Sequence, residues 1–293
     1  MRALVRGKAV RGMIAAAALA IAVSAGCALP AAAQSDNAYD VLLIGVDRRD
    51  ESWFGNSDVM MLVTINDSKE KIFVTSFLRD LGVDIPGIGL HKLNAACANG
   101  GPELTVETIE QNFDLKIDNY AMVDFNSMRD IVDAVGGVDI EMDEDEVVVA
   151  NDYIKTMCEA NDDRFEDHEI KGSGLLHLDG YQAVGYCRNR FTGSENDFGR
   201  TERQRKVIHA IVDGIRDESV FGAVLTALKI LPSIESDLGA GDTVNLLSKA
   251  PAIISYGMEE LHIPYDDLYT IQDEMLMYDH DETISRLHAT IFG

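Results

Sequence analysis

Basic residues are scarce in this sequence, and their scarcity argues against one broad class of function. The chain has 25 lysines and arginines against 50 aspartates and glutamates, a formal net charge of −25 at pH 7. Four of the basic residues fall within the first 11 positions, so the rest of the chain is more acidic still. Such a field repels nucleic acid and anionic lipid, so we expect no nucleic-acid partner. It also makes any local group of arginines notable.

Cysteine and linker-like sequence are sparse as well. Beyond the first forty residues the cysteines are Cys97, Cys158 and Cys187, and their spacing is unlike that of metal ligands. An odd number permits one disulfide and a spare thiol, but the sequence does not assign the pair. No stretch rich in Pro, Gly or Ser divides residues 39–293, so we expect a single domain there with one large core.

Residues 1–38 have a composition of their own and predict export. Basic residues come first, an apolar run covers 13–25, and no acid occurs before Asp36. This is the layout of an export signal. Cleavage after Ala33 would follow the small residues Ala31 and Ala33, whereas an uncleaved run would anchor the chain in the cytoplasmic membrane. Either outcome places residues 39–293 at the extracytoplasmic face of the membrane or in the cell wall.

Strand-like and helix-like patterns alternate after Tyr39, which is typical of a layered α/β domain. Apolar runs predict buried strands at 41–46, 59–65 and 71–77, and the short link at 66–68 favours an antiparallel hairpin. The sheet is therefore expected to be mixed. Further along, we expect a helix over 102–112, a helix to 135 capped by Asn126, a strand over 138–142, a loop over 158–174, a helix over 180–186 capped by Asp179, a long helix from 201, and two or three helices in the C-terminal third.

Two aspartates stand at the ends of the first two predicted strands. Asp47 follows the first strand directly, and Asp58 precedes the second. Carboxylates at neighbouring strand ends can share a hard cation such as Mg²⁺, which leaves its other positions to water and phosphate. A single aspartate at a strand end is more often a turn or cap residue, so neither position identifies a metal site alone.

Arginines concentrate between positions 188 and 205 of this acidic chain. Arg188 and Arg190 share a face if their segment is extended, and Arg200, Arg203 and Gln204 share one if theirs is helical. Guanidinium forks bind phosphate oxygens two at a time, so a converging set suits a diphosphate. The alternative is that these arginines pair with the abundant surface acids.

Seven sequence blocks follow one another in a recognisable order. The blocks are 42–49, 57–61, 76–80, 92–96 with 100–104, 133–138, 177–180, and 188–190 through 197–205. In these blocks the chain resembles the LytR-CpsA-Psr family of cell-wall glycopolymer ligases, and the resemblance runs from residue 39 to 293. Asn56 departs from the pattern, because many members have arginine before the Ser-Asp pair.

The resemblance implies a phosphotransferase with a three-layer α-β-α fold, its central mixed sheet flanked by helices. Such enzymes take a glycopolymer from a polyprenyl pyrophosphate carrier and join it by a phosphodiester to peptidoglycan, usually at a muramic acid hydroxyl. Asp47 and Asp58 match the family's magnesium-associated aspartates, with Mn²⁺ as the alternative ion. The positions assigned to catalysis are Arg79, Asp80, Arg188, Arg190 and Asp197. Those assigned to the pyrophosphate are Arg49, Lys92, Asn94, Arg200, Arg203 and Gln204.

Several alternatives stay open at this point. Asp80 and Asp197 are both candidates for the group that deprotonates or orients the acceptor hydroxyl. The same site could pass its phosphoryl group to water and act as a hydrolase, or the protein could bind lipid or wall polymer without turnover and regulate. A slot for the lipid tail is expected near Phe113, Met122, Phe125 and Ile211, which are equally ordinary core residues. The sequence does not identify the glycopolymer.

Overall fold

A computed structural model of the chain describes most of the residues from 38 onward. They are 38–46, 48, 53–189, 203–204, 206–208, 210–211, 214, 226, 229–230, 233–239, 241, 249, 252–253 and 256–293. Contacts group the chain into two compact units, unit 1 (Met1–Asp124 with Ile234–Gly293) and unit 2 (Phe125–Ser233). The predicted leader lies outside the described residues except for Ala38. No helix in the described part is both long and apolar enough to cross a membrane.

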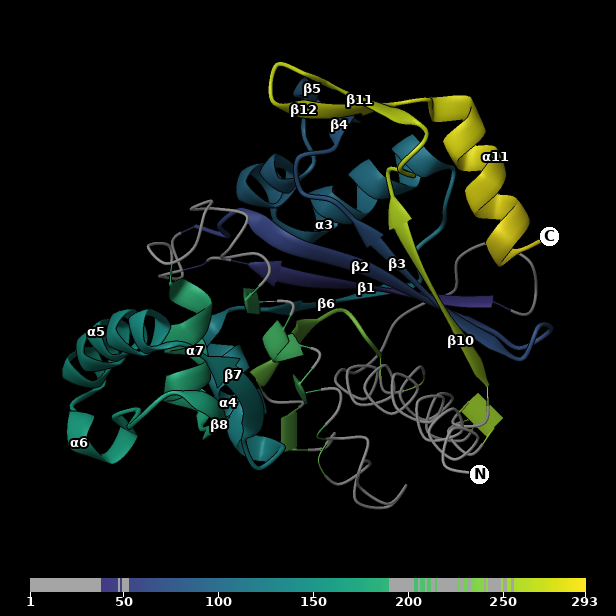
Figure 1. The fold of residues 1–293 in the computed structure, drawn as a ribbon. Helices are drawn as coiled ribbons and strands as arrows, with labels where there is room; N and C mark the ends of the chain where they lie inside the picture. Colours follow the sequence, from purple (N-terminus) through teal and green to yellow (C-terminus); the bar gives the residue numbers. More distant parts are fainter. Residues whose placement is uncertain are drawn as a thin grey trace. The chain divides into compact units, whose positions relative to one another are not determined.

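A six-stranded mixed sheet, in the order β10-β3-β2-β1-β6-β9, forms the centre of unit 1 (Figure 1). β1, β2 and β3 pair antiparallel in sequence, while β6 runs parallel to β1 and β10 parallel to β3. The strands are β1 (Ala38–Val46), β2 (Ser57–Asn66), β3 (Lys71–Phe77), β6 (Asn119–Val123), β9 (Glu235–Ser236) and β10 (Gly257–Ile263). The three predicted strands, their hairpin and the mixed character of the sheet are confirmed.

Two helices, α3 (Asn94–Phe113) and α11 (His280–Ile291), pack on one face of this sheet (Figure 1). The apolar side chains of β1, β2 and β3 on that face join those of both helices in one buried core. Phe113 is fully buried there, with its ring centroid 4.9 Å from that of Phe77 and 5.5 Å from that of Tyr278. Phe113 and Met122, two of the residues expected near a lipid slot, are thus members of the core.

Helix α3 begins at Asn94, eight residues before the start that the sequence predicted. Gly100 (φ −153°) and Gly101 (φ 71°) interrupt it, and Pro102 follows. Proline fits the first turn of a helix, so the sequence pattern revealed only the second segment. α3 therefore consists of two helical segments that meet at a kink.

Two small hairpins complete unit 1. They are formed by β4 (Gly82–Ile85) with β5 (Gly89–Lys92), and by β11 (Tyr269–Gln272) with β12 (Met275–Tyr278). Of the two or three helices predicted for the C-terminal third, α11 is described throughout, and the region before residue 256 is described only in part. The sequence did not predict the strands β10, β11 and β12 that precede α11. Short apolar runs do not distinguish a strand from a helical segment by period alone.

Four helices and a two-stranded sheet occupy residues 125–189 of unit 2, which the structure describes without a gap. They are α4 (Phe125–Ala134), β7 (Val138–Met142), α5 (Glu144–Asn161), α6 (Phe165–His168), β8 (Gly174–Leu178) and α7 (Gly180–Arg188). β7 and α7 are confirmed, and α4 begins one residue before its expected cap, Asn126. The predicted loop over 158–174 was wrong at both ends and in its middle, because α5, α6 and β8 take up parts of it. Of the long helix expected from 201, the described residues 203–204, 206–208, 210–211 and 214 are all helical.

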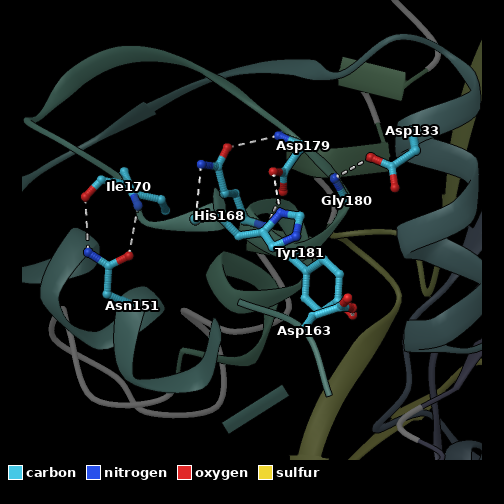
Figure 2. A network of polar contacts seen from close by, with 9 residues as sticks. Asp133, Asn151, Asp163, His168, Ile170, Asp179, Gly180 and Tyr181 are labelled. Atoms are coloured by element: carbon cyan, nitrogen blue, oxygen red, sulfur yellow. Dashed lines mark hydrogen bonds and ion pairs between the residues drawn. The ribbon is translucent and has the colours of Figure 1, made fainter. Parts of the chain in front are cut away.

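The start of α7 carries a capping network, drawn in Figure 2. Asp179 Oδ1 accepts from the Gln182 amide at 2.9 Å, and the Asp179 amide donates to Gln182 Oε1 at 2.9 Å, which is a capping box. His168 Nδ1 lies 2.8 Å from Asp179 Oδ2. The Gly180 amide donates to Asp133 Oδ1 at 2.7 Å, so two carboxylates occupy the electropositive end of the helix.

We expect Asp179→Ala to lower the free energy of unfolding by about 1–2 kcal/mol, because it removes the cap of α7. Asp179→Asn should lower the free energy of unfolding much less, because the asparagine side-chain oxygen can still cap α7. The lost ion pair with His168 is partly exposed and therefore contributes little. Urea titration followed by circular dichroism measures both. Equal losses in the two variants would show that the charge on Asp179, and not the cap, stabilises this end.

The three cysteines of the described chain are buried and free. The disulfide that the sequence left open is therefore not formed among them. Burial raises the pKa of the Cys97 thiol to about 12. Burial likewise raises the pKa of Cys158 and Cys187 above the ordinary thiol value.

Candidate active site

Asp58 occupies a bulge at the beginning of β2. Val46 pairs with Ser57 and Gly45 pairs with Val59, so Asp58 is the extra residue on its strand. A bulge bends the strand and re-aims a side chain, and bulges are common beside active sites. Gly45 allows the two strands to approach closely here, because a Cβ at this position would lie 3.1 Å from Val59 Cβ. The side chain of Asp58 is 3% exposed.

Arg79 meets Asp58 from the turn that follows β3. Arg79 Nη1 donates to Asp58 Oδ1 at 2.9 Å, and the arginine side chain is 12% exposed. Its backbone is fixed on both sides, because the Leu78 amide donates to the Ile263 carbonyl and the Asn94 amide donates to the Arg79 carbonyl. The guanidinium thus projects from a rigid turn, which is the support a charge-binding group needs to hold its geometry.

Asp80 and Lys92 extend this cluster. Lys92 Nζ lies 3.0 Å from Asp80 Oδ1, and Arg79 Nε lies 3.6 Å from Asp80 Oδ2. The Leu276 amide donates to the Asp80 carbonyl at 2.8 Å, which holds this turn against β12. Asp80 is therefore bracketed by two cations, and the β4–β5 hairpin delivers one of them.

The N-terminus of α3 lies next to this turn through the contact of the Asn94 amide with Arg79. No side chain caps that helix end, and no acid occurs in its first turn. The partial positive charge of the helix end is therefore not offset by a local carboxylate of α3. We use "unit-1 cluster" below for Asp58, Arg79, Asp80, Lys92 and Asn94, the five predicted site residues of unit 1 that the structure describes together.

Unit 2 holds the other described site residues, and its arginines already have partners there. The Arg188 guanidinium lies 5.7 Å from the ring centre of Phe125 and 5.3 Å from that of Tyr153. Aromatic faces attract guanidinium ions without neutralising them. These contacts hold the Arg188 side chain at the end of α7.

Arg203 is more deeply buried than Arg188. Its side chain is 7% exposed, with Nε 2.9 Å from Glu146 Oε1 and Nη1 donating to the Asn189 carbonyl at 3.3 Å. Glu146 also closes the capping box of α5, so the arginine ties two segments of unit 2 together. The neighbouring Gln204 is buried as well. The described contacts of Arg203 support a positioning role more directly than contact with a phosphate.

Five predicted site residues lie outside the described part of the chain. They are Asp47, Arg49, Arg190, Asp197 and Arg200. Their assigned roles stay predictions.

A divalent cation is implied by the family resemblance, and the described residues can be compared with its needs. No three His, Cys, Asp or Glu side chains gather as a metal site in the part of the chain that the structure describes. Mg²⁺ needs only one or two carboxylates when phosphate supplies further oxygens. Asp58 provides one such carboxylate beside Val46, the residue that directly precedes Asp47. The donor set is compatible with a metal shared with a phosphate ligand.

Sequence reasoning missed an aromatic pair beside the unit-1 cluster. Trp53 and Phe54 precede β2, and Trp53 Nε1 donates to the Ala98 carbonyl of α3 at 3.1 Å. Their place four and five residues before Asp58 was the available signal, but no spacing rule points to aromatics there.

Comparison with known proteins gives a consistent result. Residues 12–289 match the LytR_cpsA_psr family. The chain is 34% identical over 222 residues to the polyisoprenyl-teichoic acid–peptidoglycan teichoic acid transferase TagU of Oceanobacillus iheyensis, covering 72% of this chain and 62% of that protein. It is 32% identical to the TagU of Halalkalibacterium halodurans over 197 residues, covering 67% of this chain and 58% of that protein. The chain thus spans about three fifths of the length of these relatives.

Solved structures show the same architecture. The LytR-CPS2A-psr family protein YwtF (TagT) with bound octaprenyl pyrophosphate lipid superposes with a TM-score of 0.57 at 24% identity, covering 90% of this chain and 94% of that one. This likeness establishes the fold. The mixed sheet flanked by helices that the sequence predicted is confirmed.

Proposed function

The chain belongs to the LytR-CpsA-Psr family, and from that premise we propose that it transfers a glycopolymer from a polyprenyl pyrophosphate carrier to peptidoglycan. The acceptor would be a muramic acid hydroxyl, joined through a phosphodiester. The observation that carries the proposal is the unit-1 cluster, in which a buried carboxylate and two cations converge on one rigid turn. The transferase names of the TagU relatives support it.

In the proposed reaction the acceptor hydroxyl attacks the phosphorus that carries the glycan. The bond from that phosphorus to the bridging oxygen breaks, polyprenyl monophosphate leaves, and the hydroxyl proton passes to a base. Negative charge builds on the equatorial oxygens and on the leaving phosphate. Fixed cations aimed there lower the barrier chiefly by electrostatics and positioning.

Arg79 and Lys92 are the described cations suited to this task. Arg79 offers a planar fork for two phosphate oxygens, and Lys92 offers a compact charge next to it. The N-terminal end of α3, which no side chain caps, adds the partial positive charge of the helix dipole on the same side. We assign the pyrophosphate to this side of unit 1, with Asn94 at its margin.

We further propose that Asp58 and Asp47 would hold Mg²⁺ or Mn²⁺. Such an ion would neutralise charge on the pyrophosphate when bound. Arg79 holds Asp58 in place through the 2.9 Å hydrogen bond.

Asp80 is our candidate for orienting or deprotonating the acceptor hydroxyl. It is partly exposed and lies between Arg79 and Lys92, the two cations that we assign to the phosphate. The alternative base, Asp197, lies outside the described residues. We also propose that residues 1–38 anchor or export the chain, so that the reaction takes place outside the cytoplasmic membrane.

The test is turnover of a polyprenyl-pyrophosphate glycan by the purified full chain with Mg²⁺, with and without peptidoglycan. We expect phosphodiester-linked product and polyprenyl monophosphate only when acceptor is present. Release of monophosphate without acceptor would identify a hydrolase instead. Tight binding with no product under either condition would show a binding protein and overturn the proposal.

A further inference from the structure

Trp53 is the single tryptophan of the chain, and its side chain is held in a fixed but open position. The indole Nε1 donates to the Ala98 carbonyl at 3.1 Å, which satisfies the one polar group of the ring. The residue is nevertheless 50% exposed. The hydrogen bond fixes one edge of the indole, and half of the residue remains accessible to solvent. Trp53 therefore presents a fixed apolar ring surface to solvent, called the aromatic plate below.

Phe54 continues this surface and explains the kink in α3. A Cβ at Gly101 would lie 3.0 Å from the Phe54 ring, so the ring rests directly on the glycine backbone. Gly101 has a φ of 71°, a backbone conformation that residues other than glycine rarely adopt. The interruption of α3 therefore provides a seat for the aromatic pair, and Phe54 remains 38% exposed.

The pair lies close to the unit-1 cluster. Ala98, which holds Trp53, is one helical turn from Asn94, about 6 Å along the axis. The Asn94 amide donates to the Arg79 carbonyl at 3.1 Å. Trp53 also precedes the bulged Asp58 by five residues. Two independent connections thus place the aromatic plate next to the proposed pyrophosphate groups.

The openness of the plate indicates what it contacts. A prenyl chain is stabilised only when most of its surface leaves water, and a half-exposed ring cannot provide that. A sugar ring has one face of weakly polarised C–H bonds and a hydroxyl edge that remains hydrated. The C–H face suits the negative face of an aromatic ring, while the edge stays in solvent.

We infer that Trp53, seated with Phe54 on the kink of α3, is a stacking platform for the sugar that the pyrophosphate carries. The inference rests on the proposed function for the identity of the donor. It deepens that function by giving the chain a sugar subsite on unit 1, outside the phosphate-binding side chains. Trp53 acts here in binding, and it takes no part in bond making or breaking.

Intrinsic fluorescence of the full chain tests the contact directly, because every tryptophan photon comes from residue 53. The probes are inorganic pyrophosphate, farnesyl pyrophosphate, and farnesyl-pyrophosphoryl N-acetylglucosamine, each with Mg²⁺. We expect the sugar-bearing probe to quench and shift the emission more than the two sugar-free probes. Equal responses to the two farnesyl probes would overturn the sugar assignment.

Calorimetric titration of variants completes the test. Trp53→Ala should lower the affinity for the sugar-bearing probe about tenfold, equivalent to about 1.4 kcal/mol, and leave the affinity for farnesyl pyrophosphate unchanged. Trp53→Phe should retain most of the affinity, and Tyr269→Ala, an exposed aromatic of β11, serves as the matched control. Unchanged affinity of Trp53→Ala for the sugar-bearing probe would refute the platform. These binding results are separate from turnover, so the absence of acceptor-dependent transfer by wild type would overturn only the proposed reaction.

Discussion

Arg79→Ala is expected to lower the rate of glycopolymer transfer by about 10²- to 10³-fold, by analogy with the removal of one oxyanion donor. The guanidinium combines two tasks in our proposal, because it faces the phosphate and also holds Asp58 at 2.9 Å. Its loss would leave charge on the leaving phosphate less stabilised and the carboxylate less well fixed. The rate constant under saturating donor, measured with acceptor present, reports this loss.

Arg79→Lys separates these two tasks. Lysine retains the charge but not the planar fork, so we expect an intermediate loss of rate with the pairing to Asp58 partly preserved. Arg286→Ala is the matched control, because Arg286 makes a two-point pair with Asp267 on the exposed surface of α11. Thermal unfolding of each variant shows whether the fold survives. Wild-type rates in a folded Arg79→Ala protein would refute the site.

The second large effect concerns Asp40 of β1, which the proposed chemistry does not use. The residue is 1% exposed, accepts a hydrogen bond from the Thr64 hydroxyl, and has Asp118 as a neighbour. Burial, reinforced by the Asp118 carboxylate, raises the pKa of Asp40 from 3.8 to about 7, although the Thr64 hydroxyl and Lys116 oppose the rise. At intermediate pH the folded protein therefore binds a proton that the unfolded chain has lost.

Stability should consequently fall as pH rises. The stabilising contribution of this group is fully present below about pH 4 and is lost as pH rises through about 7, because a raised pKa favours the folded state only while it holds the extra proton. Asp40→Asn removes the titration and keeps an oxygen for Thr64. Between pH 4 and pH 8 we expect the free energy of unfolding of Asp40→Asn to rise relative to that of wild type by up to about 4 kcal/mol, at 1.4 kcal/mol per pKa unit.

Urea unfolding of both proteins at several pH values measures the difference. Asp67→Asn is a suitable control, since that carboxylate pairs with Lys249 near the surface. Parallel pH profiles for wild type and Asp40→Asn would contradict the prediction. The difference between the two proteins cancels the pH dependence of the many other acids.

The sequence predicted those parts of the fold in which local pattern and tertiary burial agree. β1, β2 and β3 are runs of apolar residues buried in the sheet, and α7 begins at an aspartate that caps it as expected. Helix α5 was missed because exposed apolar residues such as Val148 obscure the helical stripe of its buried residues, which are Val147, Ala150, Ile154 and Cys158. Its capping box, Asp143 with Glu146, was the signal that would have revealed it.

The site was predictable in composition but not in arrangement. Motif matching named Asp58, Arg79, Asp80 and Lys92, and the structure brings these four together on unit 1. The bulge that singles out Asp58 depends on strand register, which no local pattern encodes. The seat of Trp53 and Phe54 depends on a helix kink and a tertiary hydrogen bond, so it could not be found from spacing.

The buried cysteines can also report on the local unfolding of each unit. Cys97 lies in α3 of unit 1, and Cys158 and Cys187 lie in α5 and α7 of unit 2. Burial raises the pKa of all three thiols, so a thiol reagent can react only after the surrounding helices have separated. The order in which the three cysteines acquire a mass label therefore shows which unit unfolds locally first. The rate of labelling at each cysteine shows how often its unit opens, and no engineered probe is needed.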